Sequence, residues 1–229
     1  MKKGQVLIVV PVYNEADRIA DTIKGLKEIE LIDEILIVND GSTDKTGEVI
    51  EELDVSIITL QKNKGKGFAM RKAIEEREYD YIGFVDGDLG LTSVEVEKLI
   101  YPVITDEVDF TIAKFPESNV NTKTKGGFGF VKGLAKKGVY YYTKKEINTS
   151  LSGQRVYKKE IMKYMKYIPD RYGIEVAMTV QALENGFTFK EVPVNMTHRY
   201  SDRSLEGFKH RGKQFLDIFK TLIIMYFRR

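Results

Sequence analysis

The sequence of 229 residues contains no cysteine and only two histidines. Without cysteine the chain has no disulfide, no zinc–cysteine site and no thiol nucleophile, which suits a cytoplasmic protein. The formal net charge is only +2, so the charge balance does not indicate nucleic acid as a partner. No stretch reaches the roughly 18 consecutive apolar residues that a membrane-spanning helix needs.

Hydrophobic residues make up 42% of the chain, which is enough for one sizeable core. The apolar run near the N-terminus meets Pro11 at once and is too short for a signal peptide, so it predicts a first strand. We expect one domain over residues 1–229. Its expected parts are a nucleotide-binding half (1–110), an acceptor half (111–200) and a C-terminal amphipathic helix (201–229).

Strands and helices are predicted to alternate in the first half of the chain. Apolar runs indicate strands at 5–10, 34–39, 55–60 and 81–86, with helical segments between them at 16–29, from the DGSTDKT turn to about 53, and at 65–76. This alternation predicts an α/β fold with a mostly parallel sheet, flanked by helices because the strands are apolar throughout. The motifs VYNE, NDGST, NKGKG and DGD all follow strand ends, where ligands bind in such sheets.

The second half is less regular in its pattern. We predict a strand at 110–113, a polar loop at 114–127, a helix at 128–144, a turn with a short strand and a helix start at 150–160, a helix at 173–185, a strand at 187–194 and a long helix at 205–227. Loop lysines could contact phosphate or simply face solvent. No internal repeat or linker is apparent.

Two carboxylates, Asp86 and Asp88, end the fourth predicted strand with only Gly87 between them. In an extended segment they would point to the same side. Adjacent carboxylates repel unless a cation lies beside them, and Mg²⁺ or Mn²⁺ favours oxygen ligands completed by substrate phosphates. The alternative is a solvated turn whose acidic residues cap a helix at Ser93.

Four motifs together, VVPVYNEADRI, ILIVNDGSTDKT, NKGKGFAMRKAI and GFVDGDLG, resemble a family 2 glycosyltransferase with a GT-A fold. The later blocks SGQRVYKKE and YGIEVAMT resemble the branch of dolichyl-phosphate mannose and glucose synthases. The HR pair at 198–199 lies in a matching position and resembles that of the glucosyl-3-phosphoglycerate synthases.

This resemblance implies a role for each matching residue. The residues expected to bind the nucleotide are Pro11, Tyr13, Asn14, Glu15, Asp40, Gly41, Ser42, Lys66, Asp86 and Gly87, with Arg71 a weaker candidate. Asp88 would be the firmer ligand of Mg²⁺ or Mn²⁺, with Asp86 and His198 beside it. Glu175 would be the catalytic carboxylate, with Asp170 as its alternative.

The phosphate or acceptor would be held by Gln154, Arg155, Arg199 and Arg203. Arginine suits phosphate because its planar fork matches the oxygens. Structural alternatives stand beside these roles. Asp40 could merely end its strand, Lys66 could begin a solvated helix, and His198 could be structural. Glu175 could simply be a polar residue near a helix start, where its negative charge interacts favourably with the helix dipole.

The implied reaction is an inverting displacement of a nucleoside diphosphate by an acceptor oxygen. UDP-glucose is the favoured donor and GDP-mannose the next. The acceptor would be a polyprenyl phosphate or a small phosphorylated molecule. Competing functions are a catalytically silent nucleotide-sugar-binding protein and a sugar-phosphate nucleotidyltransferase, although VPVYNEADR is not the glycine-rich signature that the latter needs.

The C-terminal segment has Phe208, Phe215, Phe219, Leu222 and Tyr226 on one helical face with basic residues around it. A basic amphipathic helix can lie in a membrane interface. The same pattern also fits core packing or a homodimer. We therefore expect a cytoplasmic protein, with the inner face of the membrane as an alternative location.

Overall fold

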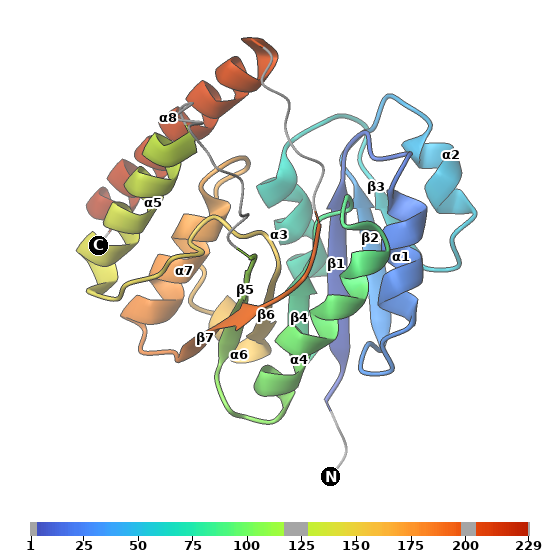
Figure 1. Ribbon diagram of the computed structural model, residues 1–229, viewed down its shortest axis with the longest axis horizontal. Coiled ribbons are helices and arrows are strands. Elements are labelled where there is room, and N and C mark those ends of the chain that lie inside the picture. The colour runs from blue at the N-terminus through green and yellow to red at the C-terminus, as the bar shows by residue number, and fades with distance from the viewer. Residues whose placement is uncertain (1–3, 117–127, 198–204, 229) are drawn as a thin grey trace.

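The computed structural model describes residues 4–116, 128–197 and 205–228, and these form a seven-stranded sheet covered by helices (Figure 1). The strands are β1 (Val6–Val12), β2 (Glu34–Asn39), β3 (Ser56–Thr59), β4 (Tyr81–Phe84), β5 (Phe110–Lys114), β6 (Arg155–Lys158) and β7 (Phe189–Pro193). Their order across the sheet is β3-β2-β1-β4-β6-β5-β7. The α/β class predicted from the sequence is confirmed.

Helices cover both faces of this sheet. They are α1 (Ile19–Lys27), α2 (Thr46–Glu51), α3 (Lys66–Glu76), a 3₁₀ helix η1 (Gly90–Val96), α4 (Glu97–Ile104), α5 (Phe128–Thr143), α6 (Lys159–Met162), α7 (Ile174–Glu184) and α8 (Leu205–Phe227). One core lies between the sheet and α1, η1 and α4. The other lies between the sheet and α3, α5 and α7, with α8 outermost (Figure 1).

The strands β1 to β4 form the parallel part of the sheet. β1 pairs with β2 and β4, and β2 pairs with β3, all in parallel register. Residues 6–10 of β1 are fully buried, as expected for a strand with helices on both faces. The carboxyl ends of these four strands therefore meet at one edge of the sheet, where the polar motifs follow them.

β6 is antiparallel within this mostly parallel sheet. It runs antiparallel to both of its neighbours, β4 and β5. Phe84 at the end of β4 is paired with Arg155 at the start of β6. Because β6 runs the other way, the loop that precedes it lies at the same sheet edge as the DGD motif. This reversal brings SGQR to the site.

α7 and α8 pack differently. α7 is buried at Ile174 and from Val176 to Ala182, and Glu175 in its first turn is partly exposed. α8 contacts α5 closely, because a Cβ at Gly138 would lie only 2.6 Å from the Leu222 side chain. The Tyr142 hydroxyl also donates to the Leu222 carbonyl at 2.7 Å. Among the described residues, no helix combines the length and apolar character needed to cross a membrane.

Candidate active site

A cavity of about 540 Å³ opens at the carboxyl ends of β1, β2 and β4. It lies where the sequence predicts the ligand crevice. Its lining comes from both halves of the chain: Pro11, Val12, Tyr13, Asp40, Asn63, Gly65, Lys66, Asp86, Leu151, Gly153, Arg171, Tyr172, Ile174, Glu175 and Gln214. Six of the predicted site residues are therefore brought together: Pro11, Tyr13, Asp40, Lys66, Asp86 and Glu175.

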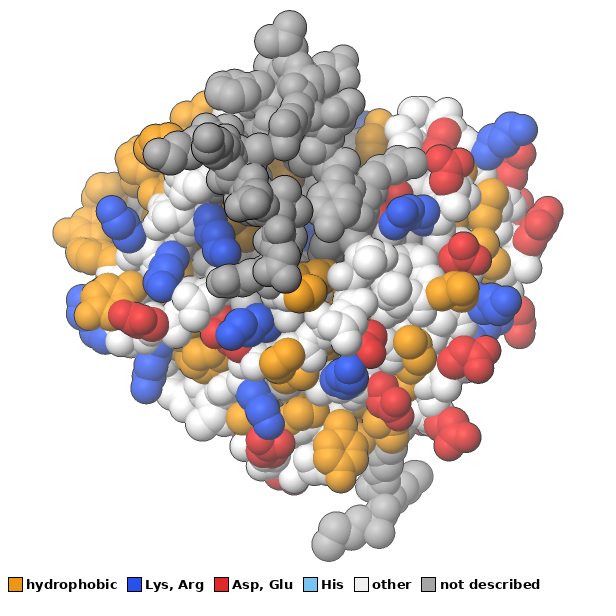
Figure 2. All heavy atoms as spheres, in the orientation of Figure 1, with side chains coloured by type: hydrophobic (Ala, Val, Ile, Leu, Met, Phe, Trp, Pro, Cys, Tyr) orange, Lys and Arg blue, Asp and Glu red, His pale blue; other side chains and the backbone are white. Residues whose placement is uncertain are grey.

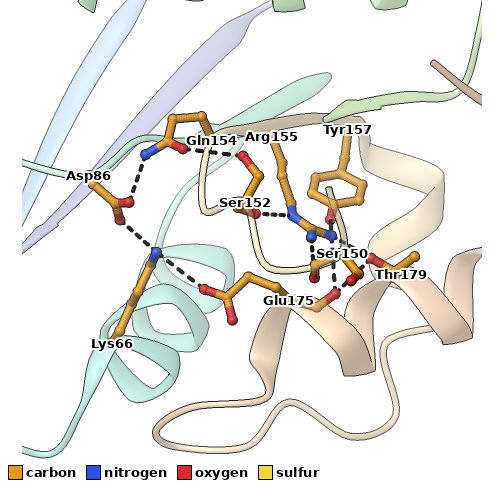
Figure 3. A network of polar contacts seen from close by, with 9 residues as sticks. All are labelled: Lys66, Asp86, Ser150, Ser152, Gln154, Arg155, Tyr157, Glu175 and Thr179. Carbon is orange, nitrogen blue, oxygen red and sulfur yellow. Dashed lines mark hydrogen bonds and ion pairs between the residues drawn. The ribbon is translucent and has the colours of Figure 1, made fainter. Parts of the chain in front are cut away.

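The polar centre of this cavity is an ammonium between two carboxylates (Figure 3). Lys66 Nζ lies 2.6 Å from Asp86 Oδ1 and 3.4 Å from Glu175 Oε1. The Lys66 and Asp86 side chains are each 29% exposed, and that of Glu175 is 15% exposed. Three residues from α3, the end of β4 and the start of α7 thus meet although up to 109 positions separate them in sequence.

The electrostatics of this group favour a cation. Burial by itself lowers the pKa of Lys66, but the charges of Asp86 and Glu175 outweigh burial and raise that pKa above its usual range. A site where two carboxylates hold a protonated amine so firmly attracts positive charge. Gly153 lies against this pair, since a Cβ there would lie 2.5 Å from Lys66 Nζ and 2.7 Å from Asp86 Oδ2.

The VYNE and NDGST turns are joined to each other by hydrogen bonds. Asn14, whose φ is 58°, donates its backbone N–H to Ser42 Oγ at 3.1 Å and accepts from the Thr43 N–H at 2.8 Å. The Glu15 N–H donates to Thr46 Oγ1 at 2.8 Å. Asn14, Glu15 and Ser42 therefore shape the wall that carries Tyr13, which is 42% exposed at the cavity.

Asp40 holds the NKGKG loop. Its two carboxylate oxygens accept the backbone N–H groups of Lys64 and Gly65, each at 2.7 Å, and the residue is only 3% exposed. Gly41, at φ 65°, packs against the backbone of Lys62. The predicted contact of Asp40 with a base stays a prediction, and the structure adds that this carboxylate orders the loop before Lys66.

A segment from Ile168 to Tyr172, which we call the strap, lies across the start of α3. The Gly67 N–H donates to the Asp170 carbonyl at 2.8 Å, and a Cβ at Gly67 would overlap the Pro169 carbonyl oxygen. Arg71 pairs with the Asp170 carboxylate and donates to the Ile168 carbonyl. The GKG glycines thus permit close backbone contact with the strap.

This contact bears on two predicted site residues. Asp170 is 62% exposed, pairs with Arg71 and is not among the residues that line the cavity. The Asp170 side chain secures the strap, and its role as the alternative to Glu175 stays a prediction. Arg71 is likewise occupied by the strap.

The DGD turn is fixed to α1 through its backbone. Thr22 Oγ1 donates to the Gly87 carbonyl at 2.8 Å, and Arg18 Nη1 donates to the Asp88 carbonyl at 2.8 Å. A Cβ at Gly87 would lie 2.8 Å from Val12 Cγ1, so glycine is needed for this close packing. Asp86 faces the cavity, whereas Asp88 is half-buried beside it.

Gln154 and Arg155 were predicted to contact phosphate. Gln154 Nε2 donates to Asp86 Oδ2 at 2.6 Å, so this amide lies at the polar centre. Arg155 is only 1% exposed and its guanidinium binds protein oxygens behind the cavity. A phosphate would first have to displace these buried partners, and the predicted phosphate contact of Arg155 stays a prediction.

Some predicted residues lie outside the described part of the chain, namely His198, Arg199 and Arg203. The cavity is also lined by residues that were not predicted from the sequence. Arg171 and Tyr172 adjoin Asp170 in the PDRYG block, and Gly153 belongs to SGQR, so their motifs gave a signal. Gln214 gave none, because it enters the cavity from the distant helix α8.

A larger cavity of about 890 Å³ lies at the opposite edge of the sheet. Its carboxylates serve the fold: Asp33 accepts the Val6 N–H at 2.8 Å and Asp80 accepts the Gln5 N–H at 2.7 Å. Asp109 is paired with Lys158 at 3.0 Å. Strand amino ends meet here, so we place the active site in the smaller cavity.

Comparison with known proteins agrees with this geometry. The chain is 28% identical to the glycosyltransferase AglJ of Haloferax volcanii, over 94% of this chain and 71% of that protein. It is 30% identical to an uncharacterized protein of Methanocaldococcus jannaschii, over 97% of this chain and 91% of that one.

Among solved structures, the chain is similar to glucosyl-3-phosphoglycerate synthase from Mycobacterium tuberculosis. The TM-score is 0.79 at 18% identity, covering 96% of this chain and 79% of the synthase, in a complex with Mn²⁺, UDP-glucose and phosphoglyceric acid. Another complex of that synthase, with Mg²⁺ and UDP, gives a TM-score of 0.76. This likeness shows the GT-A fold.

The model of one protein family matches residues 7–165, the part that contains β1 to β6 and most of the cavity. That family is described as glycosyl transferase family 2. The match covers well over half of the chain and agrees with the four motifs at the strand ends. The chain belongs to glycosyl transferase family 2 and is a glycosyltransferase.

Proposed function

We propose that this protein transfers a hexose, with inversion, from a nucleotide sugar to a phosphorylated acceptor. The observation that carries the proposal is the convergence of Asp86 and Glu175 on Lys66 within one cavity. Asp86 comes from the half that carries the nucleotide motifs, and Glu175 comes from the other half. A donor diphosphate near Asp86 would present its sugar towards Glu175.

The residues fit a divalent cation of the Mg²⁺ or Mn²⁺ type. Among described residues, His, Asp and Glu side chains do not form a group of three able to hold a metal. Magnesium commonly takes only one or two carboxylates and completes its shell with substrate phosphates. Asp86 and Asp88 would supply those carboxylates, and Asp86 already attracts the Lys66 ammonium. Such a cation would neutralise charge on the leaving diphosphate.

The chain's own residues would act on the sugar and the acceptor. An acceptor oxygen forms the new bond to the anomeric carbon as the bond to the diphosphate oxygen breaks. Glu175 would take the proton of an alcohol acceptor. An ionised phosphate acceptor carries no such proton, and Glu175 would then orient it. The negative charge of the diphosphate would attract the Lys66 ammonium away from Glu175, and Lys66 would then pair with the diphosphate.

UDP-glucose is the donor that we favour, with GDP-mannose as the alternative. The similar synthase from M. tuberculosis binds UDP-glucose and Mn²⁺, which supports this choice. That synthase also binds phosphoglyceric acid, which supports a small phosphorylated acceptor.

One surface favours a polyprenyl phosphate as acceptor instead. The inner side of α8 packs on the domain through Ile218, Thr221 and Met225. Its outer side exposes a stripe of large apolar residues, the α8 stripe: Phe215, Leu216, Phe219, Ile223, Tyr226 and Phe227. Hydrophobic side chains gather on the side of the molecule formed by α5 and α8 (Figure 2).

Charge beside the α8 stripe supports contact with an anionic membrane surface. Lys213 and Lys220 are exposed next to the stripe on the same helix. An amphipathic helix with lysines beside an apolar face lies well in a membrane interface. Gln214 of this helix lines the cavity, so a lipid-linked phosphate held at the membrane would be near the site. A homodimer through the α8 stripe is the competing arrangement.

The test begins with calorimetric titration of UDP and GDP, each with and without Mn²⁺. We expect metal-dependent binding of UDP. Transfer of labelled glucose from UDP-glucose is then measured with dolichyl phosphate in vesicles and with 3-phosphoglycerate in solution. Nucleotide binding without turnover of any donor would favour a catalytically silent binding protein, and release of pyrophosphate from UTP and glucose 1-phosphate would favour a nucleotidyltransferase.

A further inference from the structure

Arg155 is a large cationic side chain in the protein interior, 1% exposed. Buried charges are costly unless their hydrogen bonds are made. Here Nε donates to the Ser152 carbonyl at 2.7 Å and Nη2 donates to the Ser150 carbonyl at 3.0 Å. Nη1 donates to the Glu175 carbonyl at 3.0 Å and to Thr179 Oγ1 at 2.5 Å. The guanidinium thus joins two separate pieces of the chain.

The first piece is the 150–154 loop, which lies beside the polar centre. Two of its carbonyl oxygens are bound by Arg155, and its last residue, Gln154, donates to Asp86 at 2.6 Å. Gly153 of the same loop lies against Lys66 and Asp86. A shift of this loop would therefore move the groups that surround Asp86.

The second piece is the first turn of α7. Thr179 Oγ1 accepts from Arg155 and donates to the Glu175 carbonyl at 2.7 Å, so three groups close a small ring of hydrogen bonds (Figure 3). This ring fixes the backbone from which the Glu175 carboxylate extends into the cavity. Arg155 therefore lies between the supports of both carboxylates that hold Lys66.

Arginine suits this position better than lysine. Its guanidinium has five N–H donors in a rigid plane, whereas a lysine ammonium donates from one point. The acceptors of Arg155 lie on both edges of that plane, in the loop and in α7. Tyr157, on the same strand, adds its hydroxyl as an acceptor at 3.3 Å.

We propose that Arg155 is a positioning residue that sets the distance between Glu175 and Asp86 across the cavity. The inference rests on the proposed function, because it assigns Glu175 to the acceptor side and Asp86 to the donor side. Arg155 acts through the backbone of Glu175 and through the 150–154 loop, and it does not touch the reacting atoms. The turn that carries Asp86 is also fixed to α1 by Thr22 and Arg18, whereas the Glu175 carbonyl is held by Arg155. Loss of Arg155 should therefore impair the chemical step more than nucleotide binding.

The test uses four variants measured side by side. Arg155→Lys removes the fork, Thr179→Val removes the hydroxyl, Thr179→Ser restores it, and Lys158→Gln is the matched control. Lys158 lies on β6 three residues further on and pairs with Asp106 and Asp109 at the opposite edge of the sheet. Its variant thus weakens the same strand without touching the cavity.

For Arg155→Lys and Thr179→Val we expect kcat to fall about 100-fold and about 10-fold, because misplacement by about 1 Å can cost that much. The Kd for UDP with Mn²⁺ should change less than about threefold. Thr179→Ser should recover most of kcat, and Lys158→Gln should keep it despite a lower Tm. Crystal structures should show the Glu175 carbonyl displaced in Thr179→Val and restored in Thr179→Ser.

Wild-type kcat in Arg155→Lys, or in Thr179→Val if Arg155→Lys does not fold, would overturn the inference. Equal losses of UDP affinity and kcat would overturn it too, because Arg155 would then contact the ligand. The crystal structures separate this failure from that of the proposed function. If the wild type shows no turnover, a Glu175 carbonyl displaced in Thr179→Val still supports the positioning role without the proposed function. An unmoved Glu175 carbonyl in Thr179→Val refutes the positioning role.

Discussion

The two halves of the sheet build their parts of the site in different ways. In the parallel half, β3-β2-β1-β4, Tyr13, Asp40 and Asp86 each lie within two positions of a strand end, in the turn that follows it. In the other half, Glu175 begins a buried helix and depends on Arg155, Lys66 and Thr179, which come from three elements. The proposed nucleotide site is therefore encoded mainly by local turns, whereas Glu175, the proposed catalytic carboxylate, is placed by tertiary contacts.

The difference also appears in the glycines. Gly41 and Gly87 lie within the turns of the parallel half, where the chain folds back on itself or on a neighbouring strand. Gly67 and Gly173 instead allow distant segments to touch, the strap in one case and Thr221 of α8 in the other. Substitutions in the two halves should therefore have different effects.

The largest effect is expected from Asp86→Asn in the parallel half. Loss of this charge should remove metal-dependent UDP binding and lower kcat/KM by about 1000-fold or more, roughly 4 kcal/mol. Calorimetry and a transfer assay measure both. The control is Asp80→Asn, at the opposite edge of the sheet, where an amide oxygen can still accept from Gln5. Undiminished UDP affinity with Mn²⁺ in Asp86→Asn would contradict the metal assignment.

Glu175→Gln is expected to separate binding from chemistry. With an alcohol acceptor kcat should fall by about 10²- to 10⁴-fold, because the general base is lost. With a phosphate acceptor the loss should be below about tenfold, and UDP affinity should be unchanged in both cases. Steady-state kinetics with both acceptors makes the measurement. A large loss of UDP affinity would remove the contrast between the two halves.

Gly67→Ala should break the contact between the halves. Its Cβ would overlap the Pro169 carbonyl oxygen, and forced overpacking commonly costs about 1–3 kcal/mol of unfolding free energy. Gly133→Ala in α5 is the matched control, because its Cβ meets nothing within 4 Å and alanine favours a helix by up to about 1 kcal/mol. Denaturant unfolding of both variants checks this. Equal stability of the two would mean that the strap moves freely.

The α8 stripe should matter for acceptor access and not for folding. Leu216→Ser with Phe219→Ser should reduce binding to vesicles containing anionic lipid several-fold while leaving UDP affinity unchanged. Leu91→Ser, equally exposed on η1 at 55%, should bind vesicles like the wild type. Sedimentation with vesicles measures this. A change from dimer to monomer without any vesicle binding would assign the α8 stripe to a homodimer.

The smallest effect concerns acid stability at the edge far from the site. Burial raises the pKa of Asp109, but hydrogen bonds from Thr188 and Lys158 outweigh it, so the folded pKa lies below the ordinary value of 3.8. The ionised Asp109 carboxylate with its hydrogen bonds therefore contributes to folding stability above about pH 4. This contribution is lost as the pH falls through the folded pKa of Asp109. Asp109→Asn should flatten that acid limb in unfolding titrations and leave kcat unchanged. An unaltered acid limb in Asp109→Asn would show that Asp109 does not contribute to stability in this way.

Sequence reasoning reached much of the fold because most strands and helices are strongly patterned. The ends of β1, β2 and β4 were predicted to within two residues, from apolar runs that stop at polar motifs. The reversal of β6 could not be predicted, because a run of four residues carries no sign of its direction. The burial of Arg155 escaped as well, since its acceptors are backbone carbonyls whose positions only the fold fixes.

The same limit explains the site residues. Lys66, Asp86 and Glu175 were predicted through motifs, and the structure brings them into contact. The pairing of Asp170 with Arg71 could not be predicted, because a carboxylate near a motif looks the same whether it faces a cavity or an arginine. Gln214 was missed because an amphipathic pattern tells which helix face is apolar but not which residue reaches a cavity.

The close contacts of α8 with Gly138 and Gly173 set a limit on how such enzymes can be recombined. Leu222 and Thr221 each fit where only a glycine leaves room, one on α5 and the other just before the helix of Glu175. A chimera that exchanges α8 alone with a relative would need side chains that match both glycines. Acceptor preference should therefore be transferred only when α5, the start of α7 and α8 are exchanged together.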